Sequence, residues 1–144
     1  MDDRSPHLIT DLDEASCFER LAATALGRVA VSSGALPAIF PIHYVLLGRD
    51  PVFRTDPGTK LMAASSGQIL CLEIDATDPV ERTGWSVLVT GRAQILEDAE
   101  DLLAVSRLRL RPWTGSGDAY VRIEAALVSG RSVMPRPAPT PGGS

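Results

Sequence analysis

Residues that bind metals or form disulfides are scarce in this sequence. Its 144 residues include two cysteines and two histidines. Cys17 and Cys71 are far apart and show no CxxC spacing, so we expect two buried thiols and neither a zinc site nor a disulfide. His7 lies near the N-terminus, which leaves His43 as the one histidine inside the expected fold. A site with two histidine ligands is therefore excluded, and no metal site is predicted.

Long apolar runs and an excess of positive charge are missing as well. No stretch approaches the roughly 18 uninterrupted apolar residues that a membrane helix needs, and residues 1–6 lack the features of a signal peptide. Lysine and arginine total 14 against 18 aspartates and glutamates, which argues against a nucleic-acid partner. We expect a cytoplasmic protein that binds neither a membrane nor nucleic acid.

The short motifs of nucleotide-binding and hydrolytic enzymes are also absent. Neither GxGxxG nor GxxxxGK[ST] occurs, and segment 84–88 lacks the second glycine of a nucleophile elbow. Asp75, Asp78 and Glu81 fall in a region that reads as a solvated loop, so they do not suggest the carboxylate pair of a glycosidase. We therefore set aside hydrolase and nucleotide-hydrolysis functions.

The length of the chain fits one domain with one core. Residues 1–10 show no periodicity over most of their length and are expected to form a flexible N-terminal arm. Residues 135–144 contain four prolines and two glycines, a composition typical of a disordered tail. The folded domain is therefore predicted to span residues 11–134.

Hydrophobic periodicity within this domain indicates mainly β structure. The clearest signal runs from Trp85 to Ile95, where every second residue belongs to one apolar face. Thr10 and Asp13 offer a capping pair for a first helix. Six strands with peripheral helices predict a mainly β fold, a six-stranded antiparallel barrel. The expected strands are 28–32, 38–47, 52–55, 68–75, 85–95 and 119–129, and the expected helices are 11–24, 59–64 and 99–110.

The turn at residues 54–60 is the strongest candidate for ligand binding. Arg54 can present a planar fork to phosphate oxygens and Lys60 a point charge, while Thr55 and Thr59 add hydroxyl donors. A helix beginning here would also supply free amide groups. The alternative is a solvated loop in which Arg54 pairs with Asp56 and Thr59 only caps the helix.

A second group of candidates lies in segment 40–44 and in the two tryptophans. Pro41 inside a strand indicates an edge or a face turned toward a ligand. His43 is open to both a structural and a binding role. Trp85 begins its strand and is compatible with core filling, whereas Trp113 lies in a turn-rich loop where a core tryptophan is less expected.

Four segments together resemble the pyridoxamine 5'-phosphate oxidase-like flavin-binding family. They read GRVAVSSGALPAIFPIHYVLLGRDPVFRTDPGTKLMAA, CLEIDATD, GWSVLVTGRAQIL and RPW. The similarity covers about residues 17–133, and its most specific parts are VFRTDPGTKL and GWSVLVTGRA. The resemblance implies a six-stranded split barrel that forms a homodimer with two FMN sites between the subunits.

Carried over to this sequence, the resemblance also implies roles for individual residues. One group would hold the FMN phosphate, a second would run along the isoalloxazine and offer main-chain groups, and a third would flank or close the ring, partly from the other subunit. These three groups are, in order, Arg54, Thr55, Thr59 and Lys60; Pro41, Ile42, His43 and Tyr44; and Trp85, Ser86 and Trp113.

The chain also departs from pyridoxamine 5'-phosphate oxidases themselves, because their C-terminal arginine-histidine segment has no counterpart here. Oxidation of vitamin B6 is therefore doubtful. The leading expectation is an FMN-dependent oxidoreductase acting on a small molecule of unassigned identity. The alternatives are a reductase that uses the deazaflavin F420 and a non-catalytic flavin-binding or redox-sensing module. F420 has an anionic tail, and no cations beyond Arg54 and Lys60 are evident near the site in the sequence.

Overall fold

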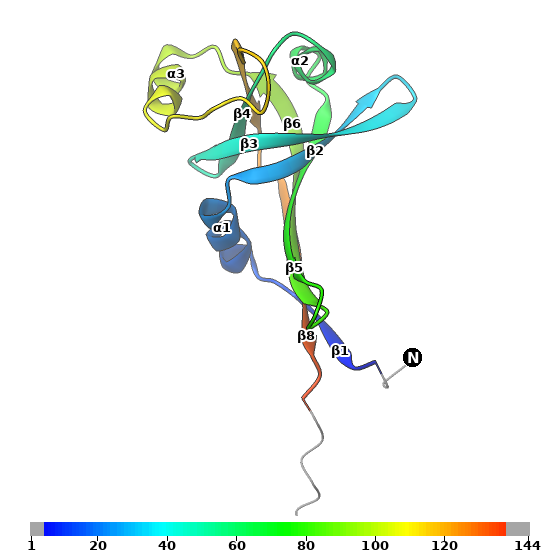
Figure 1. The fold of residues 1–144 in the computed structure, drawn as a ribbon. Coiled ribbons are helices and arrows are strands. Elements are labelled where there is room, and N and C mark those ends of the chain that lie inside the picture. The colour runs from blue at the N-terminus through cyan, green and yellow to red at the C-terminus, as the bar shows by residue number, and fades with distance from the viewer. Residues whose placement is uncertain (1–4, 138–144) are drawn as a thin grey trace, which may run out of the picture.

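The fold is known from a computed structural model that describes residues 5–137, and it consists of a barrel with a long sheet extension (Figure 1). Eight strands and three helices lie within these residues. In chain order they are β1 (His7–Asp11), α1 (Glu14–Ala23), β2 (Leu26–Ser33), β3 (Leu36–Leu47), β4 (Asp50–Thr55), α2 (Thr59–Ser65), β5 (Ile69–Asp78), β6 (Thr83–Ile95), α3 (Ala99–Ser106), β7 (Ala119–Ile123) and β8 (Leu127–Pro135).

Six of the strands close into the predicted antiparallel barrel. Their order is β6-β5-β2-β3-β4-β7, and a second pairing between β6 and β7 closes the ring. β6 is long enough to pair with two different strands along the same edge. Its last residues, Ala93 to Ile95, pair with β7, while Gly84 to Thr90 pair with β8. The barrel is therefore split along β6, and β8 and β1 extend the sheet beyond it.

The last predicted strand, residues 119–129, is divided into β7 and β8, which corrects the sequence-based expectation. The chain leaves the barrel at Glu124 and crosses over β6, where Ala126 N donates to Glu124 O at 2.8 Å. A side chain on Gly91 of β6 would collide with the Glu124 carbonyl. Glycine at position 91 therefore permits the crossing, a requirement that strand periodicity does not reveal.

The N-terminal arm expected over residues 1–10 is wrong for residues 7–10, which belong to the strand β1 (His7–Asp11). This strand pairs antiparallel with Arg131 to Pro135 of β8. Arg136 N also donates to Pro6 O at 2.7 Å, so ordered structure continues two residues past the predicted domain boundary at residue 134. The remaining parts of the expected arm and tail, residues 1–4 and 138–144, lie outside the described residues.

The helices differ from the expectation mainly at their ends. α1 begins after Asp13, whose carboxylate accepts a hydrogen bond from Ser16 N at 2.7 Å, so Asp13 and not Thr10 is the cap. α3 ends at Ser106 instead of residue 110, and Arg109 adopts a left-handed backbone with φ of 54°. Among the described residues, no helix is long and apolar enough to cross a membrane.

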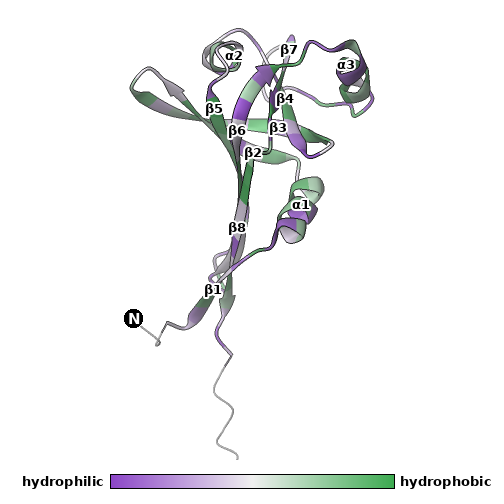
Figure 2. Cartoon of the chain, turned by 180° about the vertical axis from the view of Figure 1, so that it is seen from behind, coloured by the Kyte–Doolittle hydropathy of each residue, from purple (hydrophilic) through white to green (hydrophobic). Residues whose placement is uncertain are grey.

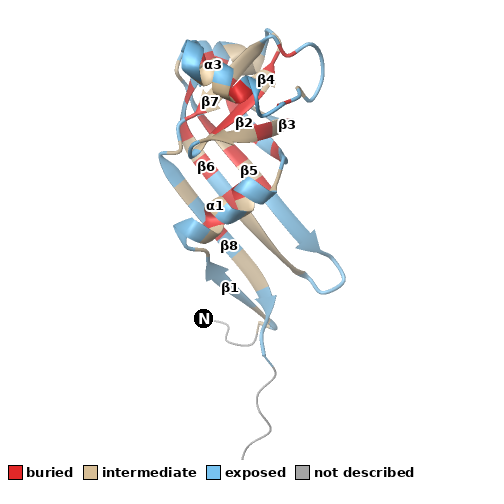
Figure 3. Cartoon of the chain, turned by 90° about the vertical axis from the view of Figure 1, so that its left-hand side faces the viewer, coloured by how far each residue is buried: buried red, intermediate tan, exposed pale blue. Residues whose placement is uncertain are grey.

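The core fills the barrel and continues under α1, which packs on one face of the sheet (Figure 3). Its fully buried side chains include Phe53, Leu72 and Val89. The opposite face of β2, β5, β6 and β8 has no covering element in the described part of the chain, and Leu88 and Leu127 are exposed there. Cys17 is buried as predicted, whereas Cys71 points to this open face and is only partly buried.

The hairpin of β2 and β3 projects from the barrel (Figure 1). Hydrophobic residues continue along it (Figure 2), and Leu36 and Ile39 are 74% and 69% exposed. The open sheet face and the hairpin thus leave apolar surface without a partner inside one chain.

Candidate functional site

A pocket of about 210 Å³ opens where β4 passes through a turn into α2. It collects six of the residues selected from the sequence, although they come from three separate segments of the chain. The lining residues are Phe40, Ile42, Arg54, Thr55, Asp56, Pro57, Gly58, Thr59, Lys60, Trp113 and Thr114. We call this cavity the turn pocket.

Lys60 is the free cation of the turn pocket, and it is the only lysine among the 144 residues. Its ammonium lies 4.3 Å from the centre of the Phe40 ring, and no ion pair with it is found among the described residues. Partial burial lowers the pKa of Lys60, while the nearby Asp56 carboxylate opposes that shift. A partly desolvated ammonium that forms no direct ion pair favours an anionic ligand, which would compensate for the solvation lost on burial.

Arg54 lies in the same pocket, but its donors are largely occupied. Its Nε, Nη1 and Nη2 donate to the carbonyl oxygens of Gly117, Leu110 and Ser116 at 2.9, 3.0 and 3.0 Å. The guanidinium also lies over the Tyr120 ring, 5.4 Å from its centre. Three of its five N–H groups are therefore used within the chain, and Arg54 is bonded to a loop, not paired with Asp56 as the alternative interpretation of the sequence expected.

Asp56 is bonded to the same loop from the other side. Its Oδ1 accepts hydrogen bonds from Ser116 Oγ at 2.9 Å and from Gly117 N at 2.6 Å. These donors lower the pKa of the Asp56 carboxyl, so it stays ionised at neutral pH. The sequence suggested for Asp56 only a place in the turn at residues 54–60 or a pair with Arg54, because nothing in the local sequence indicates a partner sixty residues away.

Thr55 and Thr59 occupy less exposed positions in the pocket wall. Thr55 is 6% exposed, and its hydroxyl donates to Asp56 O at 3.2 Å. Thr59 is the first residue of α2, where Gly58 precedes it without a side-chain cap. The Thr59 hydroxyl has no hydrogen bond among the described residues. The two hydroxyls line the pocket as predicted from the sequence, and their contact with a phosphate remains a prediction.

The alternation of hydrogen bonds along β3 leaves part of its backbone unpaired. Tyr44 N donates to Ala25 O at 3.0 Å, so even-numbered residues bond toward β2 and odd-numbered residues point away from it. β4 pairs with β3 only from Tyr44 to Leu47. The backbone groups of Pro41 and His43 therefore face an open edge, as predicted, and a proline at position 41 removes no bond to β2.

Ile42 and Tyr44 point from β3 into the core. They are 1% and 2% exposed, and Tyr44 Oη donates to Leu21 O at 2.7 Å. Burial raises the pKa of the Tyr44 hydroxyl, which therefore remains protonated at neutral pH. The main-chain groups of Ile42 and Tyr44 are turned toward β2, so the contacts that the resemblance implied for these two residues are not offered by the open edge, which is formed by Pro41 and His43.

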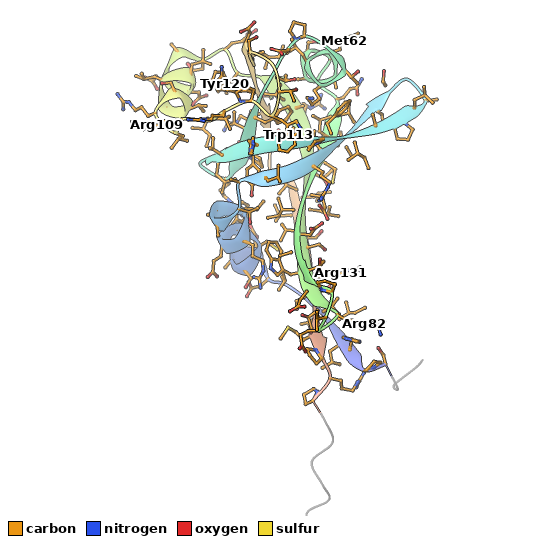
Figure 4. All side chains as sticks on the ribbon, in the orientation of Figure 1. Met62, Arg82, Arg109, Trp113, Tyr120 and Arg131 are labelled. Atoms are coloured by element: carbon orange, nitrogen blue, oxygen red, sulfur yellow. The ribbon has the colours of Figure 1, made fainter. Side chains whose placement is uncertain are left out.

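Trp113 connects the loop after α3 with the edge of β3. Its ring and the His43 imidazole lie with centroids 5.1 Å apart, tilted by 48°. Figure 4 shows Trp113 in front of β3, at the same end of the molecule as Met62 of α2. Trp113 thus forms one wall of the turn pocket, and it is 47% exposed.

Trp85 and Ser86 lie elsewhere in the chain. They line a wider hollow of about 610 Å³ beside the β5 and β6 hairpin, together with Arg82 and Arg131. Figure 4 shows those two arginines far from Trp113. The Arg20 guanidinium lies over the Trp85 ring, 5.3 Å from its centre. Within one chain these two predicted residues do not meet the turn pocket.

The loop after α3 also carries cations that the sequence interpretation missed. Arg109 and Arg111 line a hollow of about 280 Å³ together with His43, Tyr44 and other residues of β3. Neither guanidinium takes part in an ion pair or hydrogen bond among the described residues. The expectation that no further cations lie near the site is therefore wrong, and the repeated arginines of RLRLRPW were the available signal.

A family model described as pyridoxamine 5'-phosphate oxidase matches residues 13–132. The chain belongs to this family. An uncharacterized protein of Mycobacterium tuberculosis, Rv0080, is 35% identical over 137 residues, which cover 91% of this chain and 90% of that protein. Family membership confirms the resemblance that was stated from the sequence, and it leaves the substrate open.

Two solved structures show how far the fold is shared. The FAD binding protein from Mycobacterium smegmatis has a TM-score of 0.70 and 34% identity, covering 85% of this chain and 98% of that one. A FAD-binding protein from Mesorhizobium loti has a TM-score of 0.73 at 23% identity, covering 88% and 98%. The second likeness supports the split barrel alone.

Proposed function

We propose that this protein is an FMN-binding oxidoreductase that acts on a small molecule as a homodimer. The observation that carries the proposal is the turn pocket, in which the single lysine of the chain lies unpaired beside the open edge of β3. A phosphate in the pocket would gain the Lys60 charge and the hydroxyls of Thr55 and Thr59. An aromatic ring system extending from it could bond to the free backbone groups of Pro41 and His43.

A second copy of the chain would complete the site. The open sheet face presents a shallow hollow of about 420 Å³, which is lined by apolar residues such as Ile39 and Leu88 and by the charged Arg28, Glu73 and Asp75. Trp85 and Ser86 lie away from the turn pocket of their own chain, so they can contribute to a cofactor site only across an interface. An interface on this face would cover the exposed apolar side chains and supply Ser86 from the partner, whereas the Trp85 side chain lies on the other face of the sheet, under Arg20 of α1.

The bound flavin would carry the redox chemistry, and the protein would supply binding and orientation. With this division of labour, the proposal requires no catalytic acid or base from the protein. Lys60 would neutralise the phosphate, the β3 edge would fix the ring, and Trp113 would limit access of water on one side.

FAD and F420 are the competing cofactors. The Mycobacterium smegmatis relative is an FAD binding protein, and FAD contains the whole of FMN. Arg109 and Arg111, which have no ion pair among the described residues, strengthen the case for F420 relative to the sequence analysis. The tail of F420 is anionic and would be attracted by both charges. A non-catalytic flavin-binding module would use the same pocket without turning over a substrate.

The first test is to purify the protein, record its visible spectrum and determine the mass of the released chromophore. FMN is the expected chromophore. If FAD or F420 is found, the identity of the cofactor changes but the proposed site does not. Light scattering at micromolar concentration should give twice the mass of the chain. A monomer that still binds flavin would refute the shared site.

The second test separates the phosphate from the ring. Lys60→Ala should weaken FMN binding by roughly tenfold to a hundredfold, the equivalent of about 1.5–3 kcal/mol for a charge-assisted contact. Riboflavin, which lacks the phosphate, should respond little. Lys60→Arg keeps the charge and should retain most of the affinity, and Arg92→Ala removes a cation from another part of the barrel as a control. Equal losses for both flavins in Lys60→Ala would place the phosphate elsewhere.

A further inference from the structure

The loop formed by residues 110–117 is held against the barrel by Arg54, near the end of β4, and by Asp56, in the turn that follows. Arg54 donates to three of its carbonyl oxygens, at Leu110, Ser116 and Gly117. Asp56 accepts from Ser116 and from the Gly117 amide. Five hydrogen bonds to charged groups therefore connect this loop to the edge of the turn pocket.

Beyond these bonds, the loop is held by Leu110, which is buried at its start, and by Trp113, which lies against His43. It contains neither helix nor strand, and most of its residues are exposed. Gly115 and Gly117 adopt positive φ angles of 74° and 61°, and a Cβ on Gly115 would collide with the Asp56 carboxylate. Its conformation therefore depends on the close approach of Asp56 and on the guanidinium beside it.

Trp113 lies in the middle of this loop, between the residues that Arg54 binds. We infer that Arg54 and Asp56 are positioning residues, which clamp the 110–117 loop so that Trp113 forms a wall of the flavin pocket beside His43. The inference rests on the proposed function for the identity of the ligand. It assigns to Arg54 a task different from the phosphate contact expected from the sequence, because its fork is matched to backbone carbonyls.

Replacement of Arg54 by lysine separates the two tasks. Lysine keeps the positive charge that a phosphate would require, but one ammonium cannot reach three carbonyls in the planar arrangement of a guanidinium. A phosphate ligand would therefore tolerate Arg54→Lys, whereas a clamp would not. Arg92 offers a matched control, since it bonds to the single carbonyl of Gly67 at 3.2 Å, away from the turn pocket.

The test uses the full chain with Trp85→Phe, which leaves Trp113 as the only tryptophan. Acrylamide quenching of Trp113 in the flavin-free protein should rise by about twofold in Arg54→Lys, because 47% of its surface is already exposed while the loop is held. Asp56→Ala should raise it as well, by releasing the loop from the opposite side. Arg92→Lys should leave quenching unchanged. Unchanged quenching in both loop variants would overturn the clamp.

Flavin dissociation supplies the second measurement. Arg54→Lys should accelerate the release of FMN and of riboflavin by a similar factor, roughly tenfold, because a disordered wall affects the ring and not the phosphate. In a Trp113→Ala background the same change should have little further effect. Selective loss of FMN alone would overturn the inference and restore Arg54 as a phosphate ligand. If no variant binds flavin, the quenching result still decides the clamp while the proposed function fails.

Discussion

The two ends of the turn between β4 and α2 each carry one cation, and the fold uses the two cations differently. At the β4 end, Arg54 is bonded to three carbonyl groups of a distant loop. At the α2 end, Lys60 lies over an aromatic ring and is partly desolvated, and no hydrogen bond or ion pair to it is found within residues 5–137. Two like charges on one pocket therefore have separate consequences: removal of Arg54 should disturb the fold, and removal of Lys60 should disturb a ligand.

The largest expected difference between the two ends is in stability. Arg54→Ala leaves three carbonyl acceptors without their donor and should lower the free energy of unfolding by about 2–3 kcal/mol. Lys60→Ala should change it by less than about 0.5 kcal/mol, because no hydrogen bond is lost. Urea unfolding of the two variants, followed by circular dichroism, makes the comparison. Similar losses of unfolding free energy in the two variants would show that Arg54 and Lys60 do not differ in their structural roles.

Substitution of two glycines can test whether the 110–117 loop packs against Asp56. Gly115 and Gly34 both have positive φ angles, 74° and 60°, but only a Cβ on Gly115 would meet Asp56. Alanine at either position adds backbone strain of about 1 kcal/mol. Gly115→Ala should cost about 1–2 kcal/mol more than Gly34→Ala, since it also displaces the loop. Equal unfolding free energies would show that the loop is not seated on Asp56.

At the α2 end, the expected effect concerns reactivity and pH. Burial lowers the pKa of Lys60, so its amine loses its proton at lower pH than an ordinary lysine does. Binding of FMN relative to riboflavin should therefore weaken as pH rises through this lowered pKa, because the phosphate loses its counter-charge. Acylation of Lys60, located by peptide mass, should become fast in the same pH range and should be slowed by FMN but not by riboflavin. Protection by riboflavin would argue against a phosphate at Lys60.

A third cation, Arg28, lies on the open sheet face between two carboxylates. The effect expected there, on the pH dependence of stability, is the smallest of those compared. Arg28 Nη1 lies 3.3 Å from Glu73 and 3.4 Å from Asp75. Partial burial, followed by the hydrogen bond and repulsion from Asp75, raises the pKa of Glu73 to about 7. Because protonated Glu73 is favoured in the folded chain, its contribution to stability is complete below about pH 4.5 and is lost as pH rises through 7.

Glu73→Gln should remove this part of the pH dependence. The melting temperature of the native protein should fall by a few degrees between pH 5 and pH 8 relative to that of the variant. Asp56 has a lowered pKa and contributes in the opposite direction, with stability lost only as pH falls into the acidic range. A native protein and a variant that lose stability in parallel between pH 5 and pH 8 would show that Glu73 ionises normally.

Much of the turn pocket could be predicted because its chemistry is local. Arg54, Thr55, Thr59 and Lys60 are close in sequence, and a strand, turn and helix necessarily bring them to one end of a barrel strand. The sequence offered Asp56 only a turn or a pair with Arg54, because its actual partners Ser116 and Gly117 are separated from it by α2, β5, β6 and α3. No periodicity reports such a contact.

The sequence alone determined the mainly β class, the six barrel strands and the positions of the three helices. The signals were the alternation of apolar residues along strands and the glycines and prolines at turns. These features depend on neighbouring residues and on one-sided burial, which a sequence displays directly. The tertiary structure decided the crossing at Gly91, the pairing of β1 with β8, and the partners of Arg54. Each of these depends on which distant backbone groups remain unpaired once the barrel has closed, and such groups carry no mark in the sequence around them.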